Sequence, residues 1–174
     1  MSSRGDDRFE RLVLPHLDAA YNLARWLLGN DQDAEDVVQD SAIRAFDALK
    51  TFRGNDGKAW LLAIVRNSSY NCLRRRKSSR VVDFEMEDLP ADPRSVDPET
   101  LVLLTLTSDA VKAAMDELPI GYREIVVLRE LEGMSYKEIA ETTGIPIGTV
   151  MSRLSRARQR LQDMLQGSYG EETK

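Results

Sequence analysis

Cysteine and histidine are almost absent from this chain of 174 residues, which contains one of each, Cys72 and His16. A single cysteine excludes an internal disulfide, and the two residues together cannot supply the usual zinc ligand sets. The chain also lacks a phosphate-binding glycine loop, a paired nucleophile and base, and a carboxylate and histidine metal set. We therefore predict no metal, no cofactor and no catalytic residue, so the chain is not expected to be an enzyme.

Long apolar runs are missing as well. No segment is apolar over the length that crosses a bilayer, and the N-terminal sequence MSSRGDDRFERL is too polar for a signal peptide. We expect no membrane insertion and a cytoplasmic location. With 42% hydrophobic residues the chain can fill small helical cores but not the core of a large enzyme, which favours two compact helical units.

The chain also lacks the positive net charge that is typical of DNA-binding proteins, since its net charge is -5. Its charges are instead separated along the sequence. Acidic residues gather at 31–40 and 83–99, whereas basic residues gather at 74–77 and again near the C-terminus. This separation predicts different faces for DNA and for a protein partner, and weak DNA binding by the chain alone.

Three segments of the first half show the helical spacing of apolar residues. The first covers residues 9–28, is interrupted at Pro15 and ends at Gly29. The second follows a cap at Asp31 or Asp33 and buries one stripe, namely Ala34, Val37, Val38, Ser41, Ala42, Ala45, Phe46 and Leu49. The third covers residues 59–77, and its inward residues are Trp60, Leu61, Ile64, Val65 and Cys72.

Residues 78–98 break this pattern, because they contain three prolines and an excess of acidic residues without regular spacing. Asp97 and Pro98 then fit the start of a helix that ends at Pro119, and further helices follow it. We predict an all-α fold with two small helical domains joined by a flexible acidic linker. The predicted domains are residues 8–77 and 99–166, and the linker is residues 78–98. The C-terminal domain should be a bundle of about four helices.

The segment from Ser135 to Leu161 predicts a helix-turn-helix in the C-terminal domain. Ser135 and Glu138 fit a capping box, Gly144 fits the turn, and Pro146 prevents the first helix from continuing. The second helix has an apolar stripe, Val150, Leu154, Ala157 and Leu161, and an exposed face with Ser152, Arg153, Arg156 and Arg160. Such a helix enters the major groove of DNA, where its arginines contact guanine edges or phosphates.

The chain resembles bacterial RNA polymerase sigma factors in three successive segments, DAEDVVQDSAIRAFDAL, FRGNDGKAWLLAIVRNSSYNCLRRR and LPIGYREIVVLRELEGMSYKEIAETTGIPIGTVMSRLSRAR. The resemblance covers about residues 9–165 and is to the extracytoplasmic-function (ECF) group, because there is no room for the additional domains of housekeeping sigma factors. It implies a promoter-specificity subunit that binds core RNA polymerase and promoter DNA. An anti-sigma factor is an implied partner, so the chain would be a monomer when free or a heterodimer with this inhibitor.

The resemblance also assigns residues to three surfaces. The polymerase-binding surface contains Asp36, Gln39, Asp40 and Arg44. The minus-10 surface contains Trp60, Arg66, Asn67, Asn71, Arg74 and Arg75, and Asn67 matches a position that contacts a flipped-out base. The minus-35 surface contains Thr149, Met151, Ser152, Arg153, Ser155 and Arg156. Relatives often have a basic residue in place of Met151 and a larger one in place of Ser155.

Several alternatives stay open at this point. Trp60 could be a core residue or a platform on which a base stacks. Met151 could contact a thymine methyl or only pack within the protein. The acidic residues of 33–49 also fit an ordinary solvated face, and the linker fits either a mimic of nucleic acid or a plain tether.

The alternative function is that of a stand-alone helix-turn-helix transcriptional regulator. Such a protein would bind duplex DNA without polymerase, usually as a symmetric dimer. A third possibility is a protein that mainly titrates another regulator, against which the intact basic helix argues.

Overall fold

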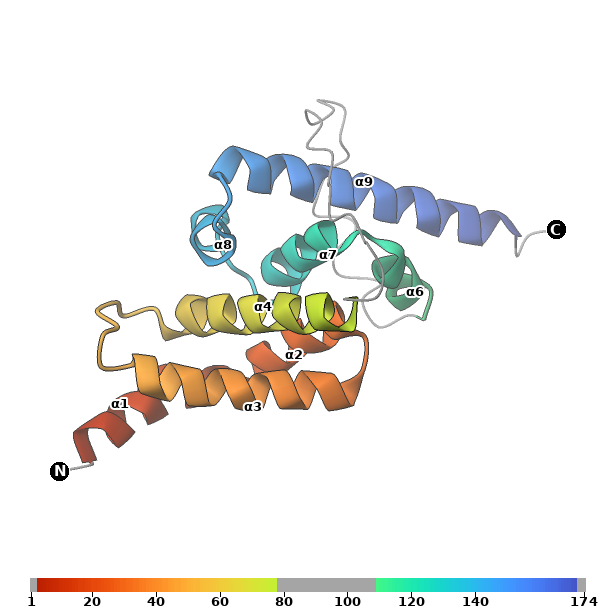
Figure 1. The fold of residues 1–174 in the computed structure, drawn as a ribbon. Helices are drawn as coiled ribbons and strands as arrows, with labels where there is room; N and C mark the ends of the chain where they lie inside the picture. The colour runs from red at the N-terminus through yellow and green to blue at the C-terminus, as the bar shows by residue number, and fades with distance from the viewer. Residues whose placement is uncertain (1–2, 78–108, 172–174) are drawn as a thin grey trace. The chain divides into compact units, whose positions relative to one another are not determined.

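The computed structural model describes residues 3–77 and 109–171 of the chain (Figure 1). Every regular element in these two ranges is helical, and they form two compact units. The first unit contains α1 to α4, and the second contains α6, α7, η2, most of α8, and α9. The predicted all-α class with two helical domains is therefore confirmed. The predicted linker and the helix start at Asp97 and Pro98 lie outside the described residues.

The first unit begins with three short elements in place of one long helix. These are α1 (Ser3–Leu12), a 3-10 turn (Leu14–His16, η1) and α2 (Leu17–Leu28). Pro15 occupies the 3-10 turn, because proline has no N–H to donate within a continuous α-helix. Gly29 ends α2 as predicted, with a left-handed φ of 83° that suits glycine, and its N–H donates to the carbonyl of Arg25.

Helix α3 (Asp31–Ala48) is capped by Asn30, so the prediction of a cap at Asp31 or Asp33 was wrong. Asn30 has the extended backbone that an N-cap requires, and its side-chain oxygen accepts the N–H of Asp33 at 2.9 Å. Phe46 is also not in the core as predicted, since it is 45% exposed. It lies about 120° around the helix from Ala34, at the margin of the buried stripe.

Helix α4 (Gly57–Arg76) begins two residues before the predicted start, because the Asp56 side chain accepts the N–H of Ala59 and caps it. Leu61, Leu62 and Val65 are fully buried as its core residues. Cys72 was predicted to be inward but is only half-buried, because it lines a groove beside α3.

Helices α2, α3 and α4 each pack on the other two, and α3 and α4 run antiparallel (Figure 1). Arg76 ties their ends together, since it pairs with the carboxylate of Asp33 and donates to the carbonyl of Leu28 at 3.1 Å. The core that the three helices enclose fixes the faces of α3 and α4 that remain exposed.

A polar cluster fixes the junction of α2 and α3. Arg25 Nε donates to Asp31 Oδ1 at 2.6 Å, and the Tyr21 hydroxyl donates to the same oxygen at 3.1 Å. These two hydrogen bonds lower the pKa of the Asp31 carboxyl below its ordinary value. The stabilisation from this group is therefore present above its unfolded-state pKa and is lost as the pH falls through its folded-state pKa.

The second unit contains α6 (Asp109–Glu117), α7 (Ile120–Val126), a π-helical segment (Val127–Leu131, η2), α8 (Tyr136–Thr143) and α9 (Ile147–Glu171). Its largest fully buried side chains are Met115, Leu118, Ile125, Leu128, Ile139 and Leu154. Arg123 closes the end of α6, because its guanidinium donates to the carbonyls of Met115 and Leu118 at 2.8 and 2.9 Å. In the described ranges, no helix is long and apolar enough to span a membrane.

Candidate functional site

The exposed face of α3 contains all four residues of the predicted polymerase-binding surface, Asp36, Gln39, Asp40 and Arg44. Arg44 Nε pairs with Asp40 Oδ2 at 2.8 Å, one helical turn apart. Two apolar side chains lie on the same helix beside them, Ile43 at 59% and Phe46 at 45% exposure. The face is therefore both charged and apolar, and sequence analysis missed its apolar part.

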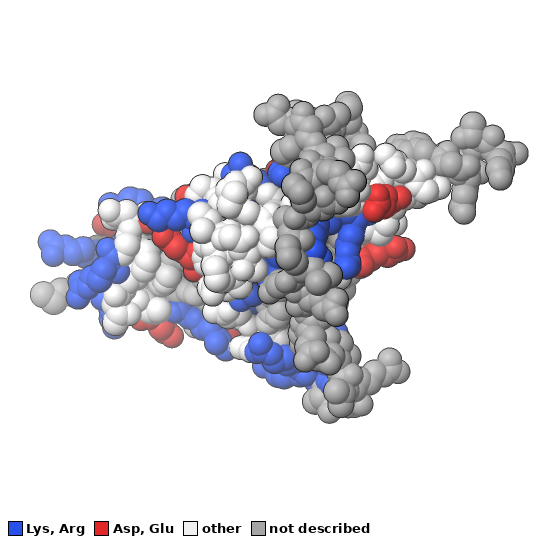
Figure 2. Space-filling model, turned by 90° about the horizontal axis from the view of Figure 1, so that it is seen from above, with Lys and Arg blue, Asp and Glu red and all other residues white. Residues whose placement is uncertain are grey.

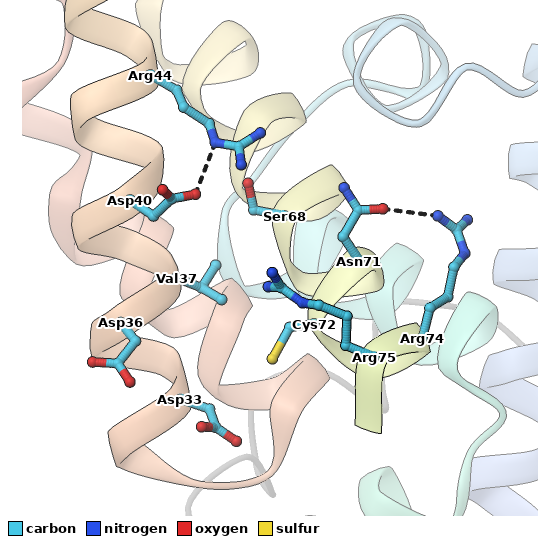
Figure 3. Close-up of a pocket in the computed structure, with 10 residues that line it drawn as sticks. All are labelled: Asp33, Asp36, Val37, Asp40, Arg44, Ser68, Asn71, Cys72, Arg74 and Arg75. Atoms are coloured by element: carbon cyan, nitrogen blue, oxygen red, sulfur yellow. Dashed lines mark hydrogen bonds and ion pairs between the residues drawn. The ribbon is translucent and has the colours of Figure 1, made fainter. Parts of the chain in front are cut away.

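A groove of about 650 Å³ separates this face from α4 (Figure 3). Its α3 wall carries the carboxylates of Asp33, Asp36 and Asp40. The α4 wall carries Ser68, Asn71, Cys72, Arg74 and Arg75. One groove thus brings three carboxylates and the guanidinium of Arg44 on α3 opposite two guanidinium groups on α4.

A second hollow, of about 360 Å³, lies on α4 and is lined by Arg66, Asn67, Tyr70, Asn71 and Arg74. The Arg66 guanidinium lies over the Tyr70 ring at 4.6 Å, and Arg74 Nη1 donates to Asn71 Oδ1 at 2.9 Å. Arginine, amide and aromatic groups together can hold phosphate, a base edge and a base face.

Four of the six residues predicted for the minus-10 surface therefore line one hollow. Arg75 lines the groove beside α3 instead. Trp60 is half-buried and stacks on Phe52, with ring centroids 4.2 Å apart, so the structure does not bring it into the hollow. Tyr70 was not assigned to this surface, although its position three residues after Asn67 places it on the same side of the helix.

The helix-turn-helix has the predicted local structure. The Ser135 N–H donates to the Glu138 carboxylate at 2.7 Å and the Glu138 N–H donates to Ser135 Oγ at 3.1 Å, which confirms the capping box. Gly144 has a φ of 75° in the turn. Val150, Leu154, Ala157 and Leu161 are buried as predicted, and Leu165 extends this stripe as α9 continues.

The arginines of α9 do not all have the same surroundings. The Arg160 guanidinium lies 5.0 Å from the centre of the Tyr122 ring, and Arg158 pairs with Glu130 of the π-helical segment. Both side chains thus have partners within the unit, although Arg160 is exposed as predicted, whereas the side chain of Arg158 is mostly buried. Arg153 and Arg156 are half-exposed.

The other residues predicted for the minus-35 surface lie near the start of α9. Met151 is exposed, whereas Thr149, Ser152 and Ser155 are partly buried, and the Ser152 hydroxyl donates to the carbonyl of Thr149 at 3.1 Å. All six predicted residues therefore fall on the first turns of one helix.

Charge is distributed over several surface areas. On the face seen in Figure 2, Lys and Arg side chains lie at separate places, with acidic side chains between them. Among the described residues, no group of His, Cys, Asp and Glu is suited to hold a metal ion. The arrangement offers binding surfaces made of arginine, amide, carboxylate and apolar groups.

Known families match both units. Residues 12–79 match the sigma-70 region 2 family, and residues 108–161 match the sigma-70 region 4 family. The ECF RNA polymerase sigma factor SigW of Bacillus subtilis is 32% identical over 173 residues, which cover 93% of this chain and 91% of SigW. This chain therefore belongs to the ECF RNA polymerase sigma factors.

Two further proteins are similar. The ECF RNA polymerase sigma factor SigE of Mycolicibacterium smegmatis is 38% identical over 162 residues, and the match covers 90% of this chain but 61% of SigE. The sigma factor RpoE from Bartonella quintana, solved in complex with the anti-sigma factor NepR, has a TM-score of 0.69 and 31% identity, with 95% of this chain and 98% of RpoE covered.

Proposed function

We propose that this chain is an alternative sigma factor that binds core RNA polymerase and directs promoter-specific transcription initiation. It recognises minus-35 and minus-10 elements and helps to melt the latter. The observation that carries this proposal is the groove of the first unit, whose acidic α3 wall and arginine-bearing α4 wall suit a protein on one side and a DNA strand on the other.

The α3 face is the proposed polymerase-binding surface. Asp36, Gln39 and Asp40 provide acceptors for basic side chains of the polymerase, and the neighbouring Ile43 and Phe46 provide apolar area that is removed from water on docking. An apolar centre with a charged margin is typical of a specific protein interface. This combination favours docking over an ordinary solvated face.

The α4 hollow is the proposed site for the non-template strand of the minus-10 element. Asn67 and Asn71 can bond to base edges, Tyr70 can stack on a base, and Arg66 and Arg74 can hold the phosphate backbone. Trp60 lies at the other end of the same helix and, since it stacks on Phe52, we assign it a supporting role.

An anti-sigma factor is the proposed inhibitor, since an anti-sigma complex is known for the similar RpoE protein. It would cover the exposed faces of α3 and α4, so the chain would form a heterodimer with it and would be a monomer when free. We also propose that the chain has no catalytic activity of its own and works in the cytoplasm, where RNA polymerase and promoter DNA meet.

The test is capture of purified core RNA polymerase by this chain, followed in the same sample by initiation from a genomic DNA library. We expect capture and transcripts that share a two-part promoter. Tight binding to duplex DNA alone, with no capture, would favour the stand-alone regulator instead.

Charge reversal on α3 should separate docking from promoter choice. The variant Asp40→Lys should bind core polymerase at least about tenfold more weakly, because it places a cation where the partner is basic and next to Arg44. The matched control Asp163→Lys makes the same change in net charge at an exposed position of α9 and should bind normally. Both should select the same promoters, and full affinity of Asp40→Lys would contradict the assignment of this face.

Substitution of arginines on α9 should distinguish base contact from phosphate contact. Arg156→Ala should cost about 1 to 3 kcal/mol at the matching minus-35 base pairs, because we assign this side chain to a base edge. Arg153→Ala should instead weaken all minus-35 sequences to a similar extent and reduce the dependence on salt. Initiation rates of each holoenzyme on single-base variants of the promoter measure the difference, and an unchanged base preference in Arg156→Ala would remove that assignment.

A further inference from the structure

The first turns of α9 carry three kinds of side chain on their solvent side. At about 100° per residue, the middle of this side is formed by small residues, Gly148, Ser152 and Ser155. One flank carries the polar and basic residues Thr149, Arg153 and Arg156. The other flank carries Ile147 and Met151, which are one turn apart and therefore adjacent on the surface.

The apolar flank is exposed to an unusual degree for such large side chains. Ile147 is 49% exposed and Met151 is 51% exposed, whereas Val150 and Leu154 of the neighbouring buried stripe are 0% and 1% exposed. About half of each side chain is therefore open to water, outside the core of the second unit. Binding becomes more favourable when a partner removes exposed apolar area of this kind from water.

We propose that Ile147 and Met151 form an apolar strip that contacts the C5-methyl groups of thymines in the minus-35 element. The inference rests on the proposed sigma function and adds a determinant of specificity to it. The small residues let the backbone of α9 approach the base edges, and the strip then lies against the bases of one strand while the basic flank faces the phosphates of the other.

The chemistry of the major groove selects the thymine methyl as the occupant. Among the four bases, thymine alone presents an apolar group there, beside its O4 acceptor. The side chains of Ile147 and Met151 offer no hydrogen-bond donor, so neither can bond to guanine O6 or to a phosphate oxygen. The arginines across the helix supply the charge complementarity that brings the strip against the duplex.

Replacement of thymine by uracil tests the inference, because uracil keeps every hydrogen-bonding group and lacks only the methyl. The full chain is assembled with core RNA polymerase, and initiation is measured on its selected promoter. Each thymine of the minus-35 element is replaced singly by deoxyuridine, on either strand. We expect at least one replacement to reduce initiation about three- to fivefold, the effect of losing one buried methyl.

Substitutions in the strip should remove this discrimination. The variants Met151→Ala and Met151→Gln, the second of which keeps the length of the side chain, should initiate equally well on the thymine and uracil promoters. The matched control Arg153→Ala should initiate less on both promoters and keep the full ratio between them. Circular dichroism checks that the variants fold, which is expected because Met151 is on the surface.

The outcomes separate the two levels of the proposal. Equal initiation by the wild-type holoenzyme on all thymine and uracil promoters, or a minus-35 element without any A·T pair, overturns the apolar strip alone. Discrimination that persists unchanged in Met151→Ala and in Ile147→Ala overturns it as well. Absence of polymerase capture and of any initiation overturns the proposed function, and the strip with it.

Discussion

Replacing Gly57 with alanine should destabilise the first unit by about 3 kcal/mol or more. A Cβ atom at this position would lie 2.0 Å from the carbonyl oxygen of Leu12, and 2.8 and 2.9 Å from its carbonyl carbon and Cα. These are backbone atoms at the end of α1, so no rotation of a side chain can relieve the contact. Overpacking of this kind costs about 1 to 3 kcal/mol when side chains can adjust, and more when they cannot.

Tryptophan fluorescence during denaturant unfolding measures this effect in the first unit. Both tryptophans of the chain, Trp26 and Trp60, belong to that unit, so the signal does not depend on the second unit. The matched control is Gly5→Ala in α1, where a Cβ would meet nothing within 4 Å. It should leave the unit equally or slightly more stable, since alanine favours a helix over glycine. A loss below about 1 kcal/mol in Gly57→Ala would show that α1 moves away easily.

Replacing Arg158 with methionine should destabilise the second unit by about 2 to 4 kcal/mol. Arg158 and Glu130 form an ion pair between α9 and the π-helical segment, and their side chains are only 15% and 13% exposed. Removal of one partner leaves the other charge in a site that is mostly closed to water. This loss of stability is smaller than the loss expected for a fully buried pair, because both side chains remain partly exposed. DNA binding at the minus-35 element should weaken to the extent that the second unit, which contains α9, unfolds.

A double-mutant cycle distinguishes the lost pairing from lost packing. The variant Arg158→Met with Glu130→Leu removes both charges and should recover most of the stability, because no unpaired charge is left. Far-UV circular dichroism during denaturation follows the helices of both units, whereas tryptophan fluorescence follows the first unit alone, so a transition seen only by circular dichroism belongs to the second unit. Additive losses in the double variant would show that the two residues act independently.

The sequence predicts best those features that depend on neighbouring residues. The capping box of Ser135 and Glu138, the turn at Gly144 and the stop at Gly29 each follow from backbone chemistry within a few residues. The buried stripe of α9 follows from helical periodicity alone. For this reason the all-α class and the helix-turn-helix could be predicted before any tertiary contact was known.

Features that depend on tertiary packing could not be predicted in the same way. Phe46 has the residue type of a core position, but its place at the margin of the α3 stripe leaves it exposed. Arg158 and Arg160 have the residue type of a DNA contact, but Glu130 and Tyr122 of the preceding elements engage them. No local sequence pattern predicts these partners, because each arginine is more than 25 residues away from its partner in the chain.

The hydrogen bond between Arg74 and Asn71 has a consequence for base identity (Figure 3). A guanidinium group can only donate, so Asn71 must turn its amide oxygen toward Arg74 and keep its NH2 group for other partners. A base that enters the α4 hollow then meets donors from Asn71 as well as from the arginines. If the hollow takes a base of the minus-10 element as proposed, we expect Asn71 and the arginines to favour the carbonyl-rich edge of thymine or the O6 of guanine over the exocyclic amine of adenine or cytosine.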